Sequence, residues 1–265
     1  MLFRSEVRDG LILATAALVI MPLVPDRFIG PFAAINLRTV WTLTVLIMAV
    51  GAAGHVAMRL LGTRNGLAIT GIASGFASSA ATIAVMGSRA RKEPALMLPA
   101  STAAILSSLA TLVQMSLVLA AVSLPTLELM WLPLSLGFAT TLVYALIFIY
   151  LGRNTESSPA NDVGGAFSIK LALLVAVSIA GISLLSAALL AWLGQGGMFI
   201  ATVLGGFADT HAPSASVASL VASGQLPAAS AVLPILAAMS SNASTKCLLA
   251  RSEERRVGKE CPRCV

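Results

Sequence analysis

The sequence predicts an all-α protein, a polytopic transmembrane bundle of about eight helices with an internal repeat. Three observations carry this prediction. Of the 265 residues, 57% are hydrophobic and 11% are charged, and the mean hydropathy is +0.91. This composition, with only three cysteines, excludes a disordered chain and a disulfide scaffold. Apolar runs of about 20 residues, the length that crosses a bilayer, recur along the chain, and two of them resemble two later ones.

Eight such runs are bounded by charge, glycine or proline. The first is short and ends at Pro22 and Pro25, which predicts a tilted, incomplete or interfacial helix. The segment before it mixes Arg4 and Arg8 with acidic residues, so we expect no cleavable signal peptide. The runs cover approximately residues 10–25, 38–61, 66–88, 95–122, 128–151, 166–193, 197–222 and 226–250.

Basic residues lie at the ends of these runs, where they would meet lipid headgroups. The chain holds 17 basic and 11 acidic residues, an excess that membrane solvation explains and that does not indicate a nucleic-acid partner. The expected partners are the lipid bilayer and a second copy or another membrane protein. The two faces of an eight-span protein nearly tie in basic residues; the face of Arg89, Arg91, Lys92 and Arg153 leads, which favours the cytoplasm for that face.

An internal repeat is the most informative feature of the organisation. Residues 69–77, ITGIASGFA, resemble residues 200–208, IATVLGGFA, at a shift of 131, and residues 98–114 resemble residues 226–242 at a shift of 128. Small residues and leucine are common enough in membrane helices to produce such a likeness by chance. If the repeat is real, its polar positions coincide: Ser78 with Asp209, Ser79 with Thr210, and Gln114 with Asn242.

The repeat divides one expected membrane domain, residues 1–250, into halves of roughly 10–125 and 126–250. Units that begin four spans apart have the same orientation in the membrane. If the third and seventh runs turn back without crossing, the units lie three crossings apart and are inverted. The sequence leaves both arrangements open.

The seventh run combines an acid, an imidazole and helix breakers. In chain order they are Gly205, Gly206, Asp209, Thr210, His211 and Pro213. Pro213 lacks the N–H that the carbonyl of Asp209 would accept, and the glycines loosen the preceding turn. The segment predicts a discontinuous helix that presents a ligand site, the device of many transporters. The alternative is a proline-kinked helix whose acid is satisfied by a neighbour. Asp209 and His211 share one site only if the helix unwinds between them.

The other candidate residues follow from the eighth run and from the repeat. Asn242 and Lys246 are four residues apart, hence on one helical face; the lysine either snorkels to the headgroups or pairs with Asp209. The first half offers Gly75 as a helix-break position, with hydroxyls after it that also suit close helix packing. No cofactor is expected, and the residues identify no metal. The candidate ion- or solute-binding set is Asp209, Thr210, His211, Asn242, Lys246, Ser78, Ser79 and Gln114.

Enzyme chemistry has little support in the sequence. There is no G-x-S-x-G elbow, H-E-x-x-H motif or glycine-rich phosphate loop, and a hydrolase that uses Asp209 and His211 would lack a nucleophile. We therefore expect a protein that is not an enzyme.

Residues 251–265, RSEERRVGKECPRCV, break the composition of the preceding chain. Cys261 and Cys264 have the spacing of half a zinc site or of a redox pair, but a second ligand pair is missing. The segment resembles an out-of-frame translation of adapter or vector sequence. We expect a non-native tail and assign it no function.

Residues 5–250 resemble the uncharacterised membrane domain, domain of unknown function 4010, in the C-terminal half of bacterial MgtC/SapB-family proteins. The resemblance rests on SEVRDGLILATAALVIMPLVPDRFIG, on NLRTVWTLTVLIMAVGAAGHVAMRLLGTRNGLAITGIASGFASSAAT, on GGFADTHAPSASVASLVASGQLP and on SSNASTK. It implies a bacterial inner-membrane protein loosely linked to magnesium homeostasis. Family members usually carry an N-terminal MgtC-type domain, and many continue past Lys246 into a further helix, so the resemblance implies a fragment.

Two functions follow as hypotheses. The first is binding or transport of a small ion or solute by Asp209, with Asn242, Ser78 and Gln114 at the interface of the repeats. The second is a non-transporting regulatory or assembly subunit whose small-residue faces bind another membrane protein. A water-lined path to Asp209 would favour the first.

Overall fold

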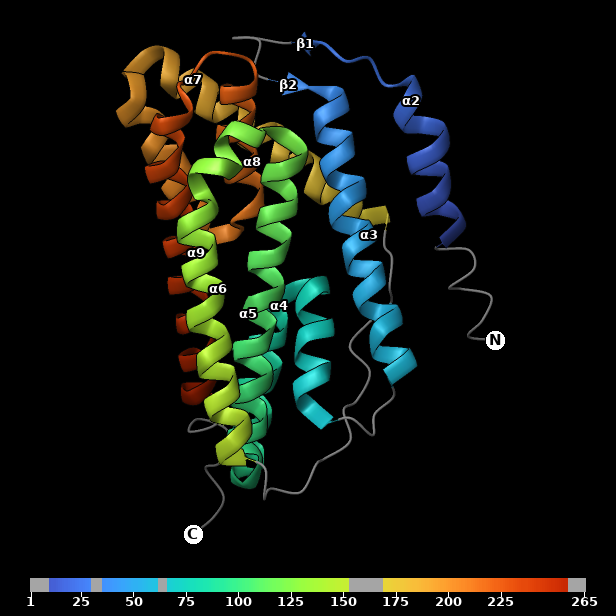
Figure 1. Cartoon of the computed structure of the whole chain (residues 1–265), viewed down its shortest axis with the longest axis vertical. Helices are drawn as coiled ribbons and strands as arrows, with labels where there is room; N and C mark the ends of the chain where they lie inside the picture. Colours follow the sequence, from blue (N-terminus) through green and yellow to red (C-terminus); the bar gives the residue numbers. More distant parts are fainter. Residues whose placement is uncertain (1–9, 30–34, 62–65, 153–168, 257–265) are drawn as a thin grey trace. The chain divides into compact units, whose positions relative to one another are not determined.

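The computed structural model describes residues 10–29, 35–61, 66–152 and 169–256 (Figure 1). The predicted all-α class is confirmed for this part of the chain, apart from one antiparallel pair of two-residue strands, β1 (Phe28–Ile29) and β2 (Ile35–Asn36). The helical elements are η1 (Ala16–Ile20), α2 (Met21–Leu23), α3 (Leu37–Leu61), α4 (Gly66–Lys92), η4 (Pro94–Leu96), α5 (Met97–Val122), α6 (Leu124–Gly152), α7 (Ile169–Ala208), α8 (His211–Ala222) and α9 (Ala228–Arg256).

Five of the described helices are long and apolar enough to cross a membrane, which indicates a multi-pass membrane protein. The first predicted run forms a shorter apolar helix, Gly10–Leu23. The runs at 66–88 and 197–222, expected as spans, fall on α4 and on the α7–α8 region, where the helices are broken. The five candidate spans are Leu37–Gly54, Pro94–Val122, Leu124–Gly152, Ile179–Ala208 and Ala228–Arg251.

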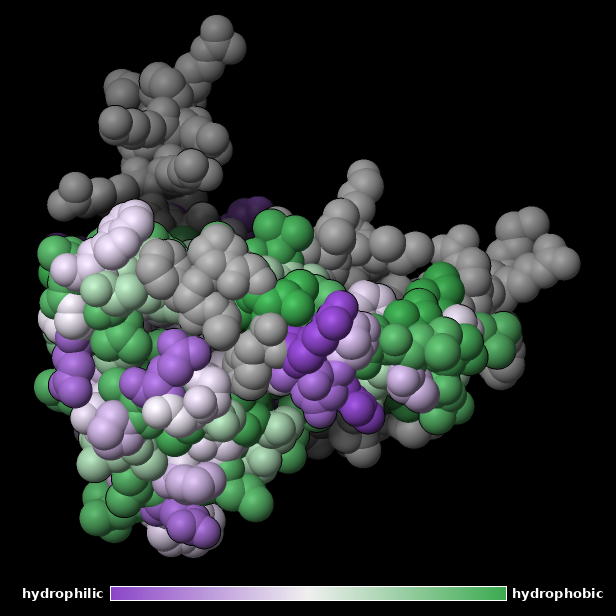
Figure 2. Space-filling view, turned by 90° about the horizontal axis from the view of Figure 1, so that it is seen from above, coloured by the Kyte–Doolittle hydropathy of each residue, from purple (hydrophilic) through white to green (hydrophobic). Residues whose placement is uncertain are grey.

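Helix α6 shows why lipid is the expected surroundings. Large apolar side chains are exposed along its length, among them Trp131 (69%), Leu136 (59%) and Tyr150 (63%), and 11% of its most apolar stretch is buried. Exposure of such a surface to water is unfavourable by about 25 cal/mol per Å², whereas a lipid environment removes this term. The end-on view in Figure 2 shows hydrophilic side chains among the apolar ones.

The chain forms two compact units. Unit 1 comprises Met1–Val50, Gln114–Pro133 and Ala166–Ala243, and unit 2 comprises Gly51–Val113, Leu134–Gly165 and Ser244–Val265. The units do not follow the predicted halves 10–125 and 126–250, because each unit takes segments from both. The chain passes from one unit to the other within α3, α5, α6 and α9.

In unit 2, α4 folds back on itself at Ser78. The backbone there is extended (φ −164°, ψ 104°) and interrupts the helix. The hydroxyl of Thr82 donates a 3.0 Å hydrogen bond to Ser74 Oγ, although residues eight apart in a straight α-helix are separated by about 12 Å. Helix α4 is therefore a hairpin with arms 66–77 and 79–92, which we call hairpin 1.

The first arm of hairpin 1 runs alongside α5 in the same direction. A Cβ atom added at Gly71 would meet the backbone of Ala103, and one at Gly75 would lie 2.6 Å from Ser107 Cα. From the first contact to the second, the position moves forward by four residues on both helices, so the two helices run parallel. Gly75, expected at the helix break, instead provides this close approach three residues before the break.

The second arm of hairpin 1 returns along the same stretch of α5. Met86 and Ala90 form a buried cluster with Ala100 and Ala103. At the start of the arm, Ser79 Oγ lies 3.3 Å from Ser107 Oγ. The arm therefore meets earlier residues of α5 as it proceeds, and it runs antiparallel to α5. Hairpin 1 thus begins and ends at the same end of α5. The predicted run 66–88 forms this broken helix and is not among the five candidate spans.

In unit 1, α7 turns sharply at Gly194. This glycine has φ +63° and ψ −155°, a backbone conformation that favours glycine. A Cβ atom at Gly197 would lie 2.6 Å from the carbonyl oxygen of Leu189, eight residues earlier. Helix α7 therefore consists of two segments, 169–193 and 195–208, which corresponds to the predicted division between the sixth and seventh runs.

The second segment of α7 and α8 form another hairpin, which we call hairpin 2. Asp209 and Thr210 separate the two helices. A Cβ atom at Gly205 would lie 3.3 Å from Pro213 Cβ, eight residues later, so the chain folds back here as it does in hairpin 1. The helix break that we expected from Gly205, Gly206 and Pro213 lies at the two residues between them. Pro213 occupies the first turn of α8, where a missing N–H leaves no hydrogen bond unmade.

We expect Thr82→Val to lower the free energy of unfolding by roughly 0.5–1.5 kcal/mol, because it removes the buried hydroxyl bond between the arms of hairpin 1. Thermal unfolding in detergent measures the effect. The matched control is Thr102→Val, since the hydroxyl of Thr102 is also buried but bonds the carbonyl of Leu98 in its own helix. Equal melting temperatures for the two variants would mean that the inter-arm bond contributes nothing.

Candidate functional site

The tip of hairpin 2 is organised by the carboxylate of Asp209. Oδ2 accepts hydrogen bonds from the backbone N–H groups of His211 (3.0 Å) and Ala212 (2.9 Å). These donors belong to the first turn of α8 and have no partner within the helix. A carboxylate at this end of a helix also interacts favourably with the helix dipole. Asp209 therefore holds the start of α8 in place.

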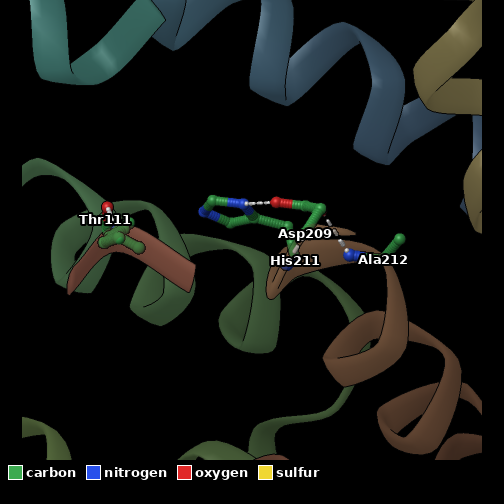
Figure 3. Close-up of polar contacts among 5 residues, drawn as sticks. Thr111, Asp209, His211 and Ala212 are labelled. Carbon is green, nitrogen blue, oxygen red and sulfur yellow. Dashed lines mark hydrogen bonds and ion pairs between the residues drawn. The ribbon is translucent and has the colours of Figure 1, made fainter. Parts of the chain in front are cut away.

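His211 completes a pair with this carboxylate. Its Nδ1 lies 2.9 Å from Asp209 Oδ1, and Figure 3 shows the two side chains directed toward each other. The helix is interrupted between them, which two residues only two positions apart need if they are to share one site. The side chain of Asp209 is 46% exposed and that of His211 is 14% exposed. The pair thus joins an accessible carboxylate to a largely covered imidazole.

Several polar atoms around this tip are buried and have no hydrogen-bond partner within the described part of the chain. They are Thr210 Oγ1, His211 Nε2, Ser214 Oγ and Ser216 Oγ. An unsatisfied buried polar group costs about 1–3 kcal/mol, and native proteins leave few of them. A small ligand or water that bonds to these atoms would remove that cost.

Ser214 and Ser216 were not among the residues that the sequence singled out. Both are fully buried, as are most residues of α8. Helix α8 packs into the core of unit 1, where Ala212 and Ala215 join side chains of α3, α5 and α7. The available signal was the alternation of small and hydroxyl residues in this helix.

Gln114 and Asn242 are buried in unit 1, with 6% and 8% of their surface exposed. Asn242 lies one turn after Ala238 on α9. A Cβ atom at Gly206 would lie 2.5 Å from the carbonyl oxygen of Ala238, so the first arm of hairpin 2 contacts the α9 backbone at this level. Gly206 is therefore a packing position, as Gly75 is in hairpin 1.

The tip of hairpin 1 resembles an uncharged version of the tip of hairpin 2. Ser78 Oγ accepts a 3.2 Å hydrogen bond from the N–H of Ala81, three residues later, as Asp209 does from Ala212. Ser78 is exposed. Ser79 is buried, and its hydroxyl lies 3.3 Å from Ser107 Oγ. Ser79 therefore joins hairpin 1 to α5, the packing role that the sequence also offered.

Lys246 belongs to unit 2, where its Nζ donates a 3.0 Å hydrogen bond to Thr111 Oγ1 on α5. The sequence offered snorkelling or a pair with Asp209, and it did not single out Thr111. Within the described ranges, no group of three or more His, Cys, Asp or Glu side chains could hold a metal ion. Helix α9 continues to Arg256; the rest of the tail, with Cys261 and Cys264, lies outside the described residues.

Residues 45–252 match the family described as "Domain of unknown function (DUF4010)". The chain belongs to this family. No curated protein and no solved structure matches it. The DUF4010 match includes both hairpins, α5 and most of α9, so the glycine contacts and both broken helices lie inside the family domain.

Proposed function

We propose that this DUF4010 protein binds and moves a small ion or solute at the tip of hairpin 2, and that Asp209 is the central ligand. The observation that carries the proposal is the set of polar groups that surround the carboxylate of Asp209. An ionisable side chain lies at a helix break in an apolar chain, beside buried hydroxyls and an imidazole nitrogen without partners. Ionisable residues in membrane segments usually mark a substrate or ion path.

The carboxylate of Asp209 has capacity for a further partner. Its two oxygens offer about four lone-pair positions, and three are used by Ala212 N–H and by His211. The fourth lone-pair position is open to a ligand, because the side chain of Asp209 is 46% exposed. Carboxylate and hydroxyl oxygens with one imidazole nitrogen suit a proton, a small cation or a solute that forms hydrogen bonds.

The internal repeat supports the same proposal. In hairpin 1 the residues in contact across the break are Ser74 and Thr82; in hairpin 2 they are Gly205 and Pro213. Each residue of the second pair follows its counterpart by 131 positions, the shift of the sequence repeat. We propose that the hairpins are repeated elements, of which the second carries the charge.

The test is a thermal-stability screen of the purified protein in detergent, with the chlorides of sodium, potassium, magnesium and calcium, and with sodium phosphate and sulfate. A ligand at about one hundred times its dissociation constant adds roughly 2.7 kcal/mol. We expect one ion to stabilise the protein and to lose this effect in Asp209→Asn. Asparagine caps a helix about as well as aspartate, so the variant removes the charge and keeps the cap.

A regulatory or assembly subunit is the second candidate, and the exposed apolar face of α6 favours it. This reading predicts that no ion shifts the melting temperature of the wild-type protein, and that a crosslinker traps α6 against another membrane protein. Binding rather than catalysis is the proposed role in both cases.

The resemblance to MgtC/SapB proteins supports two further proposals, a bacterial inner-membrane location and a link to magnesium homeostasis. Magnesium chloride in the ion screen tests the second one directly. A response to another ion alone would argue against it.

A further inference from the structure

We propose that the two hairpins enter the membrane from opposite faces, so that the chain carries an inverted-topology repeat. The inference deepens the proposed function, because inverted repeats with broken helices are an architecture of secondary transporters. It does not depend on what Asp209 binds, so a failed ion screen and a failed topology experiment would be separate results.

The first step is that neither hairpin crosses the bilayer. The arms 66–77 and 79–92 of hairpin 1 are about 18–21 Å long at 1.5 Å per residue, whereas the hydrocarbon core is about 30 Å thick. The arms of hairpin 2, residues 195–208 and α8 (His211–Ala222), have the same lengths. Each arm reaches little more than halfway, which puts both tips near the midplane.

The second step is that hairpin 1 begins and ends at the same end of α5, and that hairpin 2 also folds back at its tip. Both arms of hairpin 1 contact the same stretch of α5, since Gly75 and Ser79 meet Ser107, while Met86 and Ala90 share a buried cluster with Ala100 and Ala103. Hairpin 2 closes on itself between Gly205 and Pro213 in the same way. A hairpin of this kind returns the chain to the face from which it entered.

The third step is a count of crossings between the two hairpins. After hairpin 1, the chain passes through the candidate spans of α5 and α6. The turn at Gly194 divides the next candidate span, Ile179–Ala208. We assign the third crossing to the first segment of α7 (residues 169–193), because 25 residues at 1.5 Å per residue exceed the thickness of the hydrocarbon core, and hairpin 2 follows it. Three is odd, so hairpin 2 starts from the face opposite to that of hairpin 1. Had both runs crossed fully, the hairpin positions would be an even number of spans apart and their ends would share a face.

Cysteine accessibility in the full chain tests the proposal. Cys247, Cys261 and Cys264 are first changed to serine. Single cysteines are then introduced by Glu93→Cys, just after hairpin 1, and Gln225→Cys, just after hairpin 2; both residues are exposed. A membrane-impermeant maleimide is applied to spheroplasts and to inside-out vesicles. We expect each of these cysteines to react in only one preparation, and the two to react in different ones.

The control is Asn161→Cys, in the segment between α6 and α7. An even number of crossings separates this position from Glu93, both in the re-entrant topology and in the fully crossing one. Asn161→Cys must therefore react with the maleimide in the same preparation as Glu93→Cys. Reaction of Glu93→Cys and Gln225→Cys in the same preparation would overturn the proposal. If Glu93→Cys does not accumulate in the membrane, Ala95→Cys replaces it, and Ser223→Cys replaces Gln225→Cys in the same way.

Discussion

Replacement of Gly206 by alanine should be among the most destabilising single-methyl changes in this protein. The added Cβ would lie 2.5 Å from the carbonyl oxygen and 2.7 Å from the Cα of Ala238. Both atoms belong to the α9 backbone, which cannot move aside as a flexible side chain can. Overpacking of this kind costs about 1–3 kcal/mol, or roughly 2–4 °C of melting temperature per kcal/mol in a chain of this size.

Gly181→Ala is the matched control, because nothing lies within 4 Å of a Cβ added at that position. Glycine lowers the stability of a helix interior by about 0.5–1 kcal/mol relative to alanine, so the control should melt at the same temperature or higher. Gly75→Ala should behave like Gly206→Ala, since its Cβ would meet the backbone of Ser107 at 2.6 Å. An unchanged melting temperature for Gly206→Ala would show that α7 and α9 do not approach each other so closely.

These glycines also show how far the sequence could predict the fold. The sequence predicts Gly75 and Gly206 as helix-break positions, whereas in the structure both are positions of close helix packing. The breaks lie three residues later, at Ser78 and Asp209. A glycine within a helix serves flexibility or close packing according to what lies opposite it, and the partner helix is far away in the sequence.

Run length alone could not separate a straight helix from a hairpin. Residues 66–88 are as long as a span, and their mean apolarity gave the same interpretation. The difference is made by two buried residues: Thr82 donates across the break to Ser74 Oγ, and Ser74 donates to the carbonyl of Thr70. Such a bond joins positions eight apart, which share a helical face but are separated by about 12 Å in a straight helix, so the pattern of the sequence does not reveal the contact.

The candidate site was predictable where its chemistry is local. Asp209 and His211 lie two residues apart, so their pairing depends only on unwinding of the chain between them. The unpartnered hydroxyls of Ser214 and Ser216 depend on the burial of α8 against three other helices. That burial is a tertiary property, and no local pattern distinguishes these serines from the many others in the chain.

Asp209→Ala carries the other large effect, and its comparison with Asp209→Asn separates structure from function. Alanine leaves the N–H groups of His211 and Ala212 without the acceptor at Oδ2, and Ala212 is 2% exposed. Loss of a charged acceptor from buried donors costs roughly 1.5–3 kcal/mol. We expect a lower melting temperature for Asp209→Ala than for Asp209→Asn.

The pair of variants also decides what the carboxylate is for. Asparagine keeps an oxygen acceptor for the first turn of α8, so Asp209→Asn should fold and still lose any ion response. If Asp209→Asn and Asp209→Ala unfold at the same reduced temperature, the negative charge itself holds His211 and the start of α8, and the acid is a structural ion pair. If Asp209→Asn melts like the wild type without ions but no longer responds to the stabilising one, the charge acts on the ligand, because the capping hydrogen bonds are then intact in both proteins.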